Sequence, residues 1–553
     1  MKKVRPQLSE LSLRQKIGQM AVYPFASVVL KKLKEKDKDV SIMGGIWITG
    51  ALDMKIINMS FESTGEKVTA KSNWRFMKAL NEMMEIPILG CMDNGFGIKG
   101  QFHDMTNMVG PCAVGAADSK EYAYKMGVCK AKEMKCAGAN WLWGPEVDLA
   151  NRFSSISLCR TYSDDPDSII KLAKEEVAGI QDNGVAATVK HFPGNDEMEY
   201  RDPHTNETIM RLPVEQWKKR QGRVFQEMFD AGVYAVMVGH QSFPACDNTK
   251  KKGQYLPSTV SYKVITELLK GEMGFQGVAI TDSIGMDGLK EMFDGDLYKV
   301  SIACINAGCD VILGAGYDFI DVIEAAVNSG EIAESRIDDA CNRILNMKEK
   351  MGLFDGPAEE MDQDSVIQES ISVNQEIADN GLSLICDKYN MLPLDPLKYK
   401  KVAIIFSGYS EDVYKSLEIM KDEFEKHGVT KVHIQKDLPD RQEANVMPKE
   451  YDLMLYVGHI SCNRPHGIAG FQLEKYYTFY HNSLGGQIGK RIGVSLGSPY
   501  LYFDYYAGFG CFVNAYNYSE FTQRAFVRAL YGELPFNGGE PFKVIPKGME
   551  VNY

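Results

Sequence analysis

The feature that most constrains the fold is a series of short, almost wholly apolar runs that alternate with helical stretches through the first 350 residues. Runs of this kind are typical of strands that are buried on both faces of a parallel sheet. Repeated strand–helix units build either an open, doubly wound sheet or a closed (β/α)8 barrel. The predicted strands are GGIWITG (44–50), IPILGCMD (86–93), NWLWGPEVD (140–148), AATVKHF (186–192), YAVMVGH (234–240), GVAITDS (277–283) and DVILGAG (310–316).

Polar residues stand at the carboxyl ends of these predicted strands. In both architectures the ligand site lies at that edge of the sheet. An open sheet gathers its site at one switch point, whereas polar groups contributed by several strands fit a barrel better. We therefore predict an N-terminal (β/α)8 barrel of the TIM type. The strand-end residues are Asp93, Asp148, Lys190, His191, His240 and Asp282.

A change of composition marks the predicted end of the barrel. Residues 352–372, GLFDGPAEEMDQDSVIQESIS, are acidic and rich in turn formers. Strand–helix alternation then resumes, with a helix around 410–426. We predict a catalytic barrel domain over residues 1–355, a linker over 356–378 and a C-terminal α/β sandwich domain with a mostly parallel sheet over 379–553. The strands expected in this second domain are 382–387, 401–408, 431–435, 452–459 and 491–497.

Composition excludes several classes of function. A chain of 553 residues is too long for one core, and its net charge of -12 disfavours a nucleic-acid partner. It contains no run of 18 apolar residues and no apolar segment after its basic start, so we expect neither a membrane span nor a signal peptide. Its twelve cysteines occur singly and never as CxxC, which predicts free thiols, a cytoplasmic location and no metal or cofactor. The oligomeric state is left open.

The segment GFQGVAITDSIGM (274–286) places Asp282 at the end of a predicted buried strand, before a glycine-containing turn. A carboxylate at the mouth of a barrel is held rigidly and is partly desolvated. Those are the conditions for a nucleophile or for a group that stabilises charge. An aspartate in this position can equally cap the next helix, so the segment alone leaves both roles open.

The segment KHFPGNDEMEYRDPHTN (190–206) carries a second candidate group. After the strand end and the Pro193–Gly194 break, its loop presents Asp202 and His204 two residues apart. An Asp-x-His pair on one loop suits a carboxylate that orients an imidazole and raises its pKa. The same pair suits half of a metal site, but no second His or Cys cluster completes it. A solvent-facing loop histidine is the third reading.

Together these two segments resemble glycoside hydrolase family 3, in its β-N-acetylglucosaminidase branch. LLKGEMGFQGVAITDSIG (268–285) resembles the family signature around the catalytic aspartate, which falls on Asp282. KHFPG followed by Asp-x-His resembles the branch whose acid/base is a loop histidine, which implies that role for His204 with Asp202 orienting it. The resemblance covers most of the chain, because LSLRQKIGQM, AVMVGHQSFPACD, RIGVSLGSPY and ALYGELPFNGGEPF are also similar to family segments.

The same resemblance implies which residues bind the sugar: Asp93, Arg160, Lys190 and His191. Ionised partners suit this task, because hydroxyl groups are costly to desolvate unless they are paired. The chain also departs from the family pattern. It has Asn195-Asp196-Glu197 where the family has His-Gly-Asp, in a loop about one residue longer. It has DNGFG (93–97) in place of the usual acidic, glycine-rich motif, and the arginine expected near Gln101 is absent.

The implied activity is retaining hydrolysis of a terminal β-linked N-acetylhexosamine, most readily N-acetylglucosamine, from small glycans or cell-wall fragments. Asp282 would attack the anomeric carbon, and His204 would transfer the proton. One alternative is phosphorolysis to the sugar 1-phosphate, because a neutral base does not repel phosphate. Another is β-glucosidase or β-xylosidase activity with an acid/base from the second domain, although GHISCNRPHGIAGF (458–471) offers no glutamate before Glu474. The last is a catalytically idle carbohydrate-binding protein.

Overall fold

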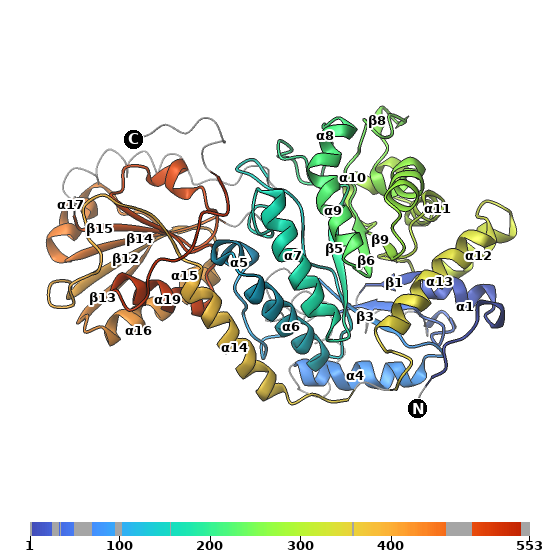
Figure 1. The fold of residues 1–553 in the computed structure, drawn as a ribbon, viewed down its shortest axis with the longest axis horizontal. Helices are drawn as coiled ribbons and strands as arrows, with labels where there is room; N and C mark the ends of the chain where they lie inside the picture. The colour runs from blue at the N-terminus through green and yellow to red at the C-terminus, as the bar shows by residue number, and fades with distance from the viewer. Residues whose placement is uncertain are drawn as a thin grey trace. The chain divides into compact units, whose positions relative to one another are not determined.

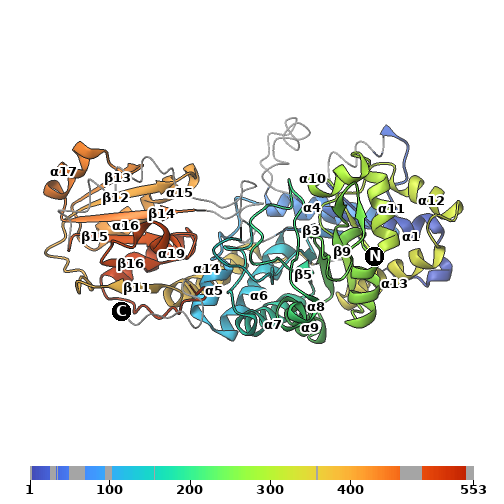
Figure 2. The ribbon, with the colours of Figure 1, turned by 90° about the horizontal axis from the view of Figure 1, so that it is seen from above.

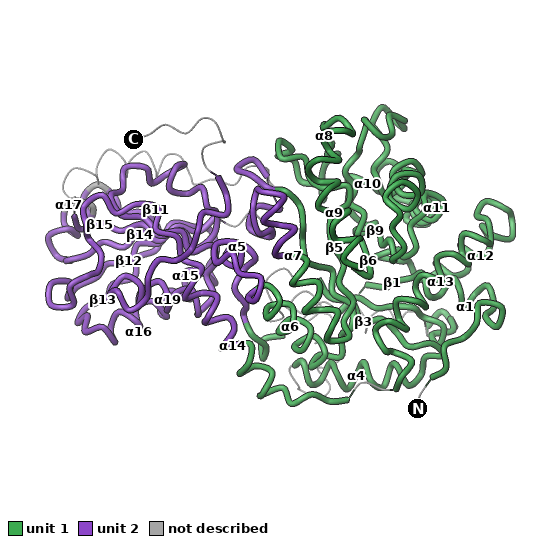
Figure 3. Tube along the Cα trace, viewed as in Figure 1, with its two compact units in different colours: residues 1–106, 123–149, 173–370 green, residues 107–122, 150–172, 371–553 purple. Residues whose placement is uncertain are grey.

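The structure is a computed structural model that describes residues 3–24, 33, 35–48, 69–93, 102–154, 156–356, 359–460 and 489–543. These residues form two compact units (Figure 3). Unit 1 comprises residues 1–106, 123–149 and 173–370, and unit 2 comprises residues 107–122, 150–172 and 371–553. Helix α14 (Gln363–Asn380) spans most of the predicted linker, and the predicted domain limits stay a prediction.

The core of unit 1 is an eight-stranded parallel sheet in the order β10-β1-β2-β3-β4-β5-β6-β9. A parallel bridge between Ile280 and Val311 joins its two ends, so the ring closes. The predicted barrel is therefore confirmed. The strands are β1 (Ala21–Tyr23), β2 (Gly45–Trp47), β3 (Leu89–Met92), β4 (Trp141–Leu142), β5 (Ala186–Phe192), β6 (Ala235–Val238), β9 (Val278–Thr281) and β10 (Ile312–Leu313).

Amphipathic helices surround these strands (Figure 1). Their apolar side chains pack against the buried strands. A left-handed glycine, Gly308, ends α11 and returns the chain to β10. The helices are α1 (Leu13–Gln19), α4 (Ala70–Met83), α6 (Lys120–Cys136), α7 (Pro166–Gln181), α8 (Val214–Lys219), α9 (Gln221–Asp230), η4 (Lys263–Glu272), α10 (Asp287–Lys290), α11 (Leu297–Ala307), α12 (Phe319–Asn328) and α13 (Glu334–Lys350), with a small hairpin, β7 (Lys250–Lys251) and β8 (Gln254–Tyr255), before η4.

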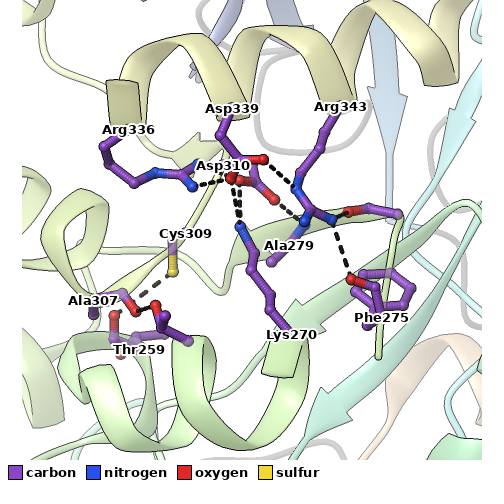
Figure 4. Close-up of polar contacts among 12 residues, drawn as sticks. Thr259, Lys270, Phe275, Ala279, Ala307, Cys309, Asp310, Arg336, Asp339 and Arg343 are labelled. Carbon is purple, nitrogen blue, oxygen red and sulfur yellow. Dashed lines mark hydrogen bonds and ion pairs between the residues drawn. The ribbon is translucent and has the colours of Figure 1, made fainter. Parts of the chain in front are cut away.

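A network of charges lies at the amino-terminal rim of the barrel, where β9 and β10 begin (Figure 4). Asp310, which is fully buried, accepts hydrogen bonds from Lys270 Nζ at 2.7 Å and from the backbone N–H of Ala279 in β9 at 2.8 Å, and it pairs with Arg336. Arg336 and Arg343 on α13 both pair with Asp339. The network ties η4, α13, β9 and β10 together at the end of the barrel opposite the expected ligand site.

Unit 2 contains a six-stranded sheet in the order β11-β16-β15-β14-β12-β13, in which only β11 runs antiparallel to its neighbour. The predicted second α/β domain with a mostly parallel sheet is therefore confirmed. Helices α16 and α19 lie side by side against this sheet (Figure 2). The elements are β11 (Ser383–Asp387), β12 (Lys401–Gly408), β13 (Lys431–Lys436), β14 (Leu453–His459), β15 (Arg491–Ser495), β16 (Cys511–Asn514), α5 (Pro111–Ala117), α15 (Glu411–Ser416), α16 (Glu418–Lys426), α17 (Arg441–Glu450) and α19 (Glu520–Leu530).

The cysteines within the described ranges are all free thiols, and most of them are buried. Burial raises the pKa of thiols such as Cys91 and Cys341, which keeps them protonated and unreactive. In the same part of the chain, no helix combines the length and the apolar character needed to cross a lipid bilayer.

Candidate active site

Asp282 follows β9 directly, at the carboxyl rim of the barrel. Its backbone N–H donates to the carbonyl of Val238 in β6 at 2.9 Å, and its side-chain Oδ1 accepts the N–H of Ser283 at 2.7 Å. The side chain is 20% exposed. Helix α10 takes Met286, not Asp282, as its N-cap residue. The helix-cap reading of this aspartate is therefore excluded.

The surroundings of Asp282 keep its carboxylate ionised. Burial works to raise its pKa, but the nearby imidazoles of His191 and His240, the N–H of Ser283 and the charge of Lys190 outweigh burial. The net result is a pKa below the ordinary value of an aspartate. A carboxylate that is rigid, desolvated and still charged at neutral pH is suited to attack on an electrophilic carbon.

His191, at the end of β5, lies between two carboxylates. Its Nδ1 is 2.8 Å from Oδ2 of Asp148, and its Nε2 is 4.0 Å from Oδ2 of Asp282. Asp148 is fully buried, and it also accepts the backbone N–H groups of His191 and Asn195 at 3.2 and 2.9 Å. Asp148 thus fixes the orientation of the imidazole and directs Nε2 towards the site. The sequence marked Asp148 only as a strand-end polar residue.

Lys190 and Asp93 form a second polar pair on the same rim. Lys190 is buried, and its Nζ lies 2.7 Å from Oδ1 of Asp93, which is more exposed. An ion pair with one accessible partner can exchange part of its contacts for the hydroxyl groups of a sugar. The structure therefore brings three of the four predicted sugar-binding residues, Asp93, Lys190 and His191, to the rim that carries Asp282.

The fourth, Arg160, belongs to unit 2, where it ends a turn and is half-buried. Its role in sugar binding stays a prediction. Two further predicted features, the glycine-rich loop after Asp93 and most of the loop 458–471, lie outside the described residues.

Asp202 and His204 make the contact that the sequence predicts. His204 Nδ1 is 2.6 Å from Oδ1 of Asp202, and the same oxygen accepts the backbone N–H of His204 at 2.8 Å. Asp202 is buried, whereas His204 is 54% exposed. Asp202 thus fixes the orientation of the imidazole through Nδ1.

The loop that carries His204 packs against the helix that follows Asp282. The carbonyl of His204 accepts the N–H of Asp287, the first residue of α10, at 3.0 Å. Gly288 allows the close approach, because a Cβ there would lie 2.6 Å from the carbonyl oxygen of Asn206. The acid/base candidate and the nucleophile candidate are thus linked through one short turn and one turn of helix.

His240, at the end of β6, holds the turn after Asp282 in place. Its Nε2 is 2.9 Å from the carbonyl oxygen of Ser283, and its Nδ1 is 3.0 Å from Oγ1 of Thr259. Burial lowers the pKa of His240, an effect that the charge of Asp282 offsets only in part. His240 is therefore neutral and donates from Nε2, a positioning role that no sequence motif indicates.

Glu146, Asp148 and His191 are close enough to suggest a metal site, since one donor atom from each lies within 4.8 Å of the others. However, N–H donors already engage both oxygens of Asp148, one from Asn195 and two from His191. The arrangement is that of a carboxylate that orients a histidine, and the chemistry of the site needs no metal ion from it.

Comparison with known proteins adds a family and a fold. Residues 12–347 match the profile of the glycosyl hydrolase family 3 N-terminal domain. The chain is 25% identical over 498 residues, 86% of each protein, to a beta-N-acetylglucosaminidase/beta-glucosidase of Cellulomonas fimi. It is 31% identical over 243 residues to beta-hexosaminidase A of Pseudoalteromonas piscicida, which is 41% of this chain and 40% of that protein. A solved beta-glucoside phosphorylase, BglX, shares the fold with a TM-score of 0.81 at 24% identity, covering 97% of this chain and 94% of that one.

Proposed function

The chain belongs to glycosyl hydrolase family 3, and from this premise we propose that it releases terminal β-linked N-acetylhexosamine, with N-acetylglucosamine preferred, by retaining hydrolysis. The observation that carries the proposal is the contact of 2.6 Å between Asp202 and His204 on the loop that packs after Asp282. This pair gives unit 1 an acid/base group of its own. The names of the Cellulomonas and Pseudoalteromonas relatives support the same sugar.

In the first step, Asp282 attacks the anomeric carbon while the bond from that carbon to the leaving oxygen breaks. Nε2 of His204 gives its proton to that oxygen, and Asp202 stabilises the histidine throughout. Lys190 and His191 bind ring hydroxyls and keep the carboxylate of Asp282 charged. The product of this step is a glycosyl ester on Asp282 with its configuration inverted.

In the second step, His204 is neutral and acts as the base. It takes a proton from water as the water oxygen attacks the anomeric carbon, and the ester bond to Asp282 breaks. A second inversion restores the original configuration, so the reaction is retaining overall. Asp282 returns to the ionised form that its surroundings favour.

Phosphorolysis is the second candidate function. A solved structure with the same fold is that of a beta-glucoside phosphorylase. A carboxylate base would repel a phosphate dianion, whereas the neutral imidazole of His204 does not, so phosphate can replace water in the second step. The product would then be a sugar 1-phosphate in place of the free sugar.

A panel of p-nitrophenyl β-glycosides, assayed with and without phosphate, tests the proposal. We expect kcat/KM for the N-acetylglucosaminide to exceed that for the glucoside by at least about tenfold. A site that pairs the acetamido group keeps unpaired polar groups when a glucoside, which lacks that group, is bound. Equal or faster turnover of the glucoside would contradict the proposed sugar. Sugar 1-phosphate as the main product in phosphate buffer would replace hydrolysis with phosphorolysis.

The buried free thiols also support a cytoplasmic location, because an oxidising compartment favours paired cysteines. Cell fractionation tests this part of the proposal. Recovery of the activity outside the cytoplasm would contradict it.

A further inference from the structure

The loop between β5 and α8, residues 193–213, has its polarity reversed. Asp196, Glu199 and Asp202 are buried, while Met198 and Tyr200 are 60% and 52% exposed. Burying a carboxylate is costly unless charged or hydrogen-bonding partners compensate for the lost water. Three buried carboxylates within seven residues therefore show that this loop is built around anions that collect donors.

Glu199 collects donors from both sides of the acid/base pair. On the near side, Arg201 gives its backbone N–H at 3.1 Å and its side-chain Nε and Nη2 at 2.8 and 2.6 Å. On the far side, the N–H of Ile209 and Nη2 of Arg211 both lie 3.0 Å from Oε2 of Glu199. One carboxylate thus closes the segment that contains Asp202 and His204 at both of its ends.

The far side of the loop is fixed to the barrel in turn. The N–H of Met210 donates to the carbonyl of Ser242 at 2.8 Å, and the N–H of Ser242 donates to the carbonyl of Thr208 at 2.9 Å. Asp196 adds a bond of 2.7 Å from the N–H of Arg211. Through these contacts, Glu199 connects the residues next to Asp202 to the rigid extension of β6.

The charge on Glu199 persists at neutral pH. Burial works to raise its pKa, but the bonds from Arg201 and from the N–H of Ile209 outweigh burial and lower it. Charged hydrogen bonds of this kind are stronger and more directional than neutral ones. An exposed histidine such as His204 gains its fixed position from the backbone that carries it, and Glu199 sets that backbone.

We propose that Glu199 is the positioning residue of the acid/base loop: it holds both limbs of the loop so that Nε2 of His204 meets the leaving oxygen of the substrate. This inference rests on the proposed role of His204. It assigns to Glu199 a function in catalysis that acts through His204, without contact with the sugar. Glu199 lies two residues after Asn195-Asp196-Glu197, the segment in which this chain departs from the family pattern.

The test compares leaving groups in Glu199→Gln. A poor leaving group, as in N,N′-diacetylchitobiose, needs a well-placed proton, so we expect kcat/KM to fall about 10- to 100-fold, within the range of general acid catalysis. With a 2,4-dinitrophenyl N-acetylglucosaminide, the dinitrophenolate departs without a proton, so the rate of glycosyl-enzyme formation should change less than about threefold. Azide, which attacks without a base, should restore turnover of the dinitrophenyl substrate.

Arg211→Met serves as a second variant, because Arg211 is 46% exposed and its replacement removes its ion pair with Glu199 but leaves that of Arg201 in place. It should show the same dependence on the leaving group with a smaller loss, even if Glu199→Gln fails to fold. Asp310→Asn, at the opposite rim, is the matched control: it also loses a buried carboxylate paired with arginine, and its activity per folded molecule should not depend on the leaving group.

Equal losses on both substrates in a folded Glu199→Gln enzyme, or no loss on either, would overturn the positioning role. The role of His204 is judged separately by His204→Ala. If His204→Ala shows no dependence on the leaving group, the proposed function fails. If it does and Glu199→Gln does not, only the present inference fails.

Discussion

Asp310 and Glu199 are two buried carboxylates with arginine partners, and they stand at opposite rims of the same barrel. Asp310 joins elements that are already ordered, since its partners lie on η4, α13 and β9. Glu199 joins two limbs of one loop that has no helix or strand of its own. The same chemistry therefore serves stability at the amino-terminal rim and catalytic geometry at the carboxyl rim, as expected for a barrel whose active site lies at the carboxyl ends of its strands.

The largest expected effect is a loss of activity when the carboxyl rim is altered. His204→Ala should lower kcat/KM on a natural disaccharide by about 10²- to 10⁴-fold, because it removes the general acid. Its melting temperature should stay close to that of the wild type, since His204 is half exposed. Steady-state kinetics and calorimetry on the same preparation measure both. A large loss of stability with unchanged kcat/KM would show that His204 serves the fold and not catalysis, which would contradict the catalytic role of the carboxyl rim.

The converse effect is expected at the amino-terminal rim. Asp310→Asn leaves Lys270 and Arg336 without their buried anion, and breaking such a pair costs about 3–5 kcal/mol of unfolding free energy. Chemical denaturation followed by fluorescence measures the loss. Activity per folded molecule should stay near the wild-type value. A stable variant with impaired catalysis would show that this network reaches the active site.

Lys348, a buried lysine on α13, can be compared with these buried carboxylates. Its described hydrogen bonds go to Oε1 of Gln19 at 2.6 Å and to the carbonyl of Gly44 at 3.4 Å. Burial lowers its pKa to about 7. The unfolded chain keeps this proton up to its ordinary pKa of about 10.4.

Between these two pKa values the unfolded state of the wild type binds more protons, so its unfolding free energy rises with pH. Lys348→Met lacks this slope. Its stability advantage should be on the order of a few kcal/mol at pH 7 and below, at about 1.4 kcal/mol per pKa unit, and should shrink towards pH 9. Melting curves across this range test the sign. A difference between the two proteins that does not change with pH would contradict the lowered pKa.

The smallest effect returns to the carboxyl rim. Asp202→Asn keeps the shape of the pair but removes the charge behind His204. A charged hydrogen bond contributes about 1.5–3 kcal/mol, so a loss of roughly 10- to 100-fold in kcat is expected on poor leaving groups. Steady-state kinetics on the natural disaccharide measure the loss. An unchanged kcat would separate Asp202 from the proton transfer.

The sequence predicted most of the fold, because buried parallel strands leave a strong apolar pattern. It missed β1 (Ala21–Tyr23) and β16 (Cys511–Asn514). It also made β4 too long: the predicted run 140–148 contains Gly144 and Pro145, and the ladder stops at Leu142 because proline has no N–H to donate.

Some contacts of the candidate site could be predicted from the sequence, and others depend on the fold. Asp202 and His204 are two residues apart, so their contact could be predicted from the chain alone. Asp148 reaches His191 across 43 residues, and His240 reaches Ser283 across 43 as well, so their roles depend on the closed barrel. Glu199 gave no signal, because an acidic residue in a polar loop is expected to face water.

Trapping of the covalent intermediate tests the central claim most directly: the carboxyl rim carries the chemistry, and Asp282 is its nucleophile. The enzyme is incubated with a slow fluorinated N-acetylglucosaminyl substrate, and intact-protein mass spectrometry is followed by peptide mapping. We predict one sugar adduct per chain, attached to Asp282, and release of a product with retained configuration. An adduct on another carboxylate, or inversion of the anomeric configuration during turnover, would contradict the account.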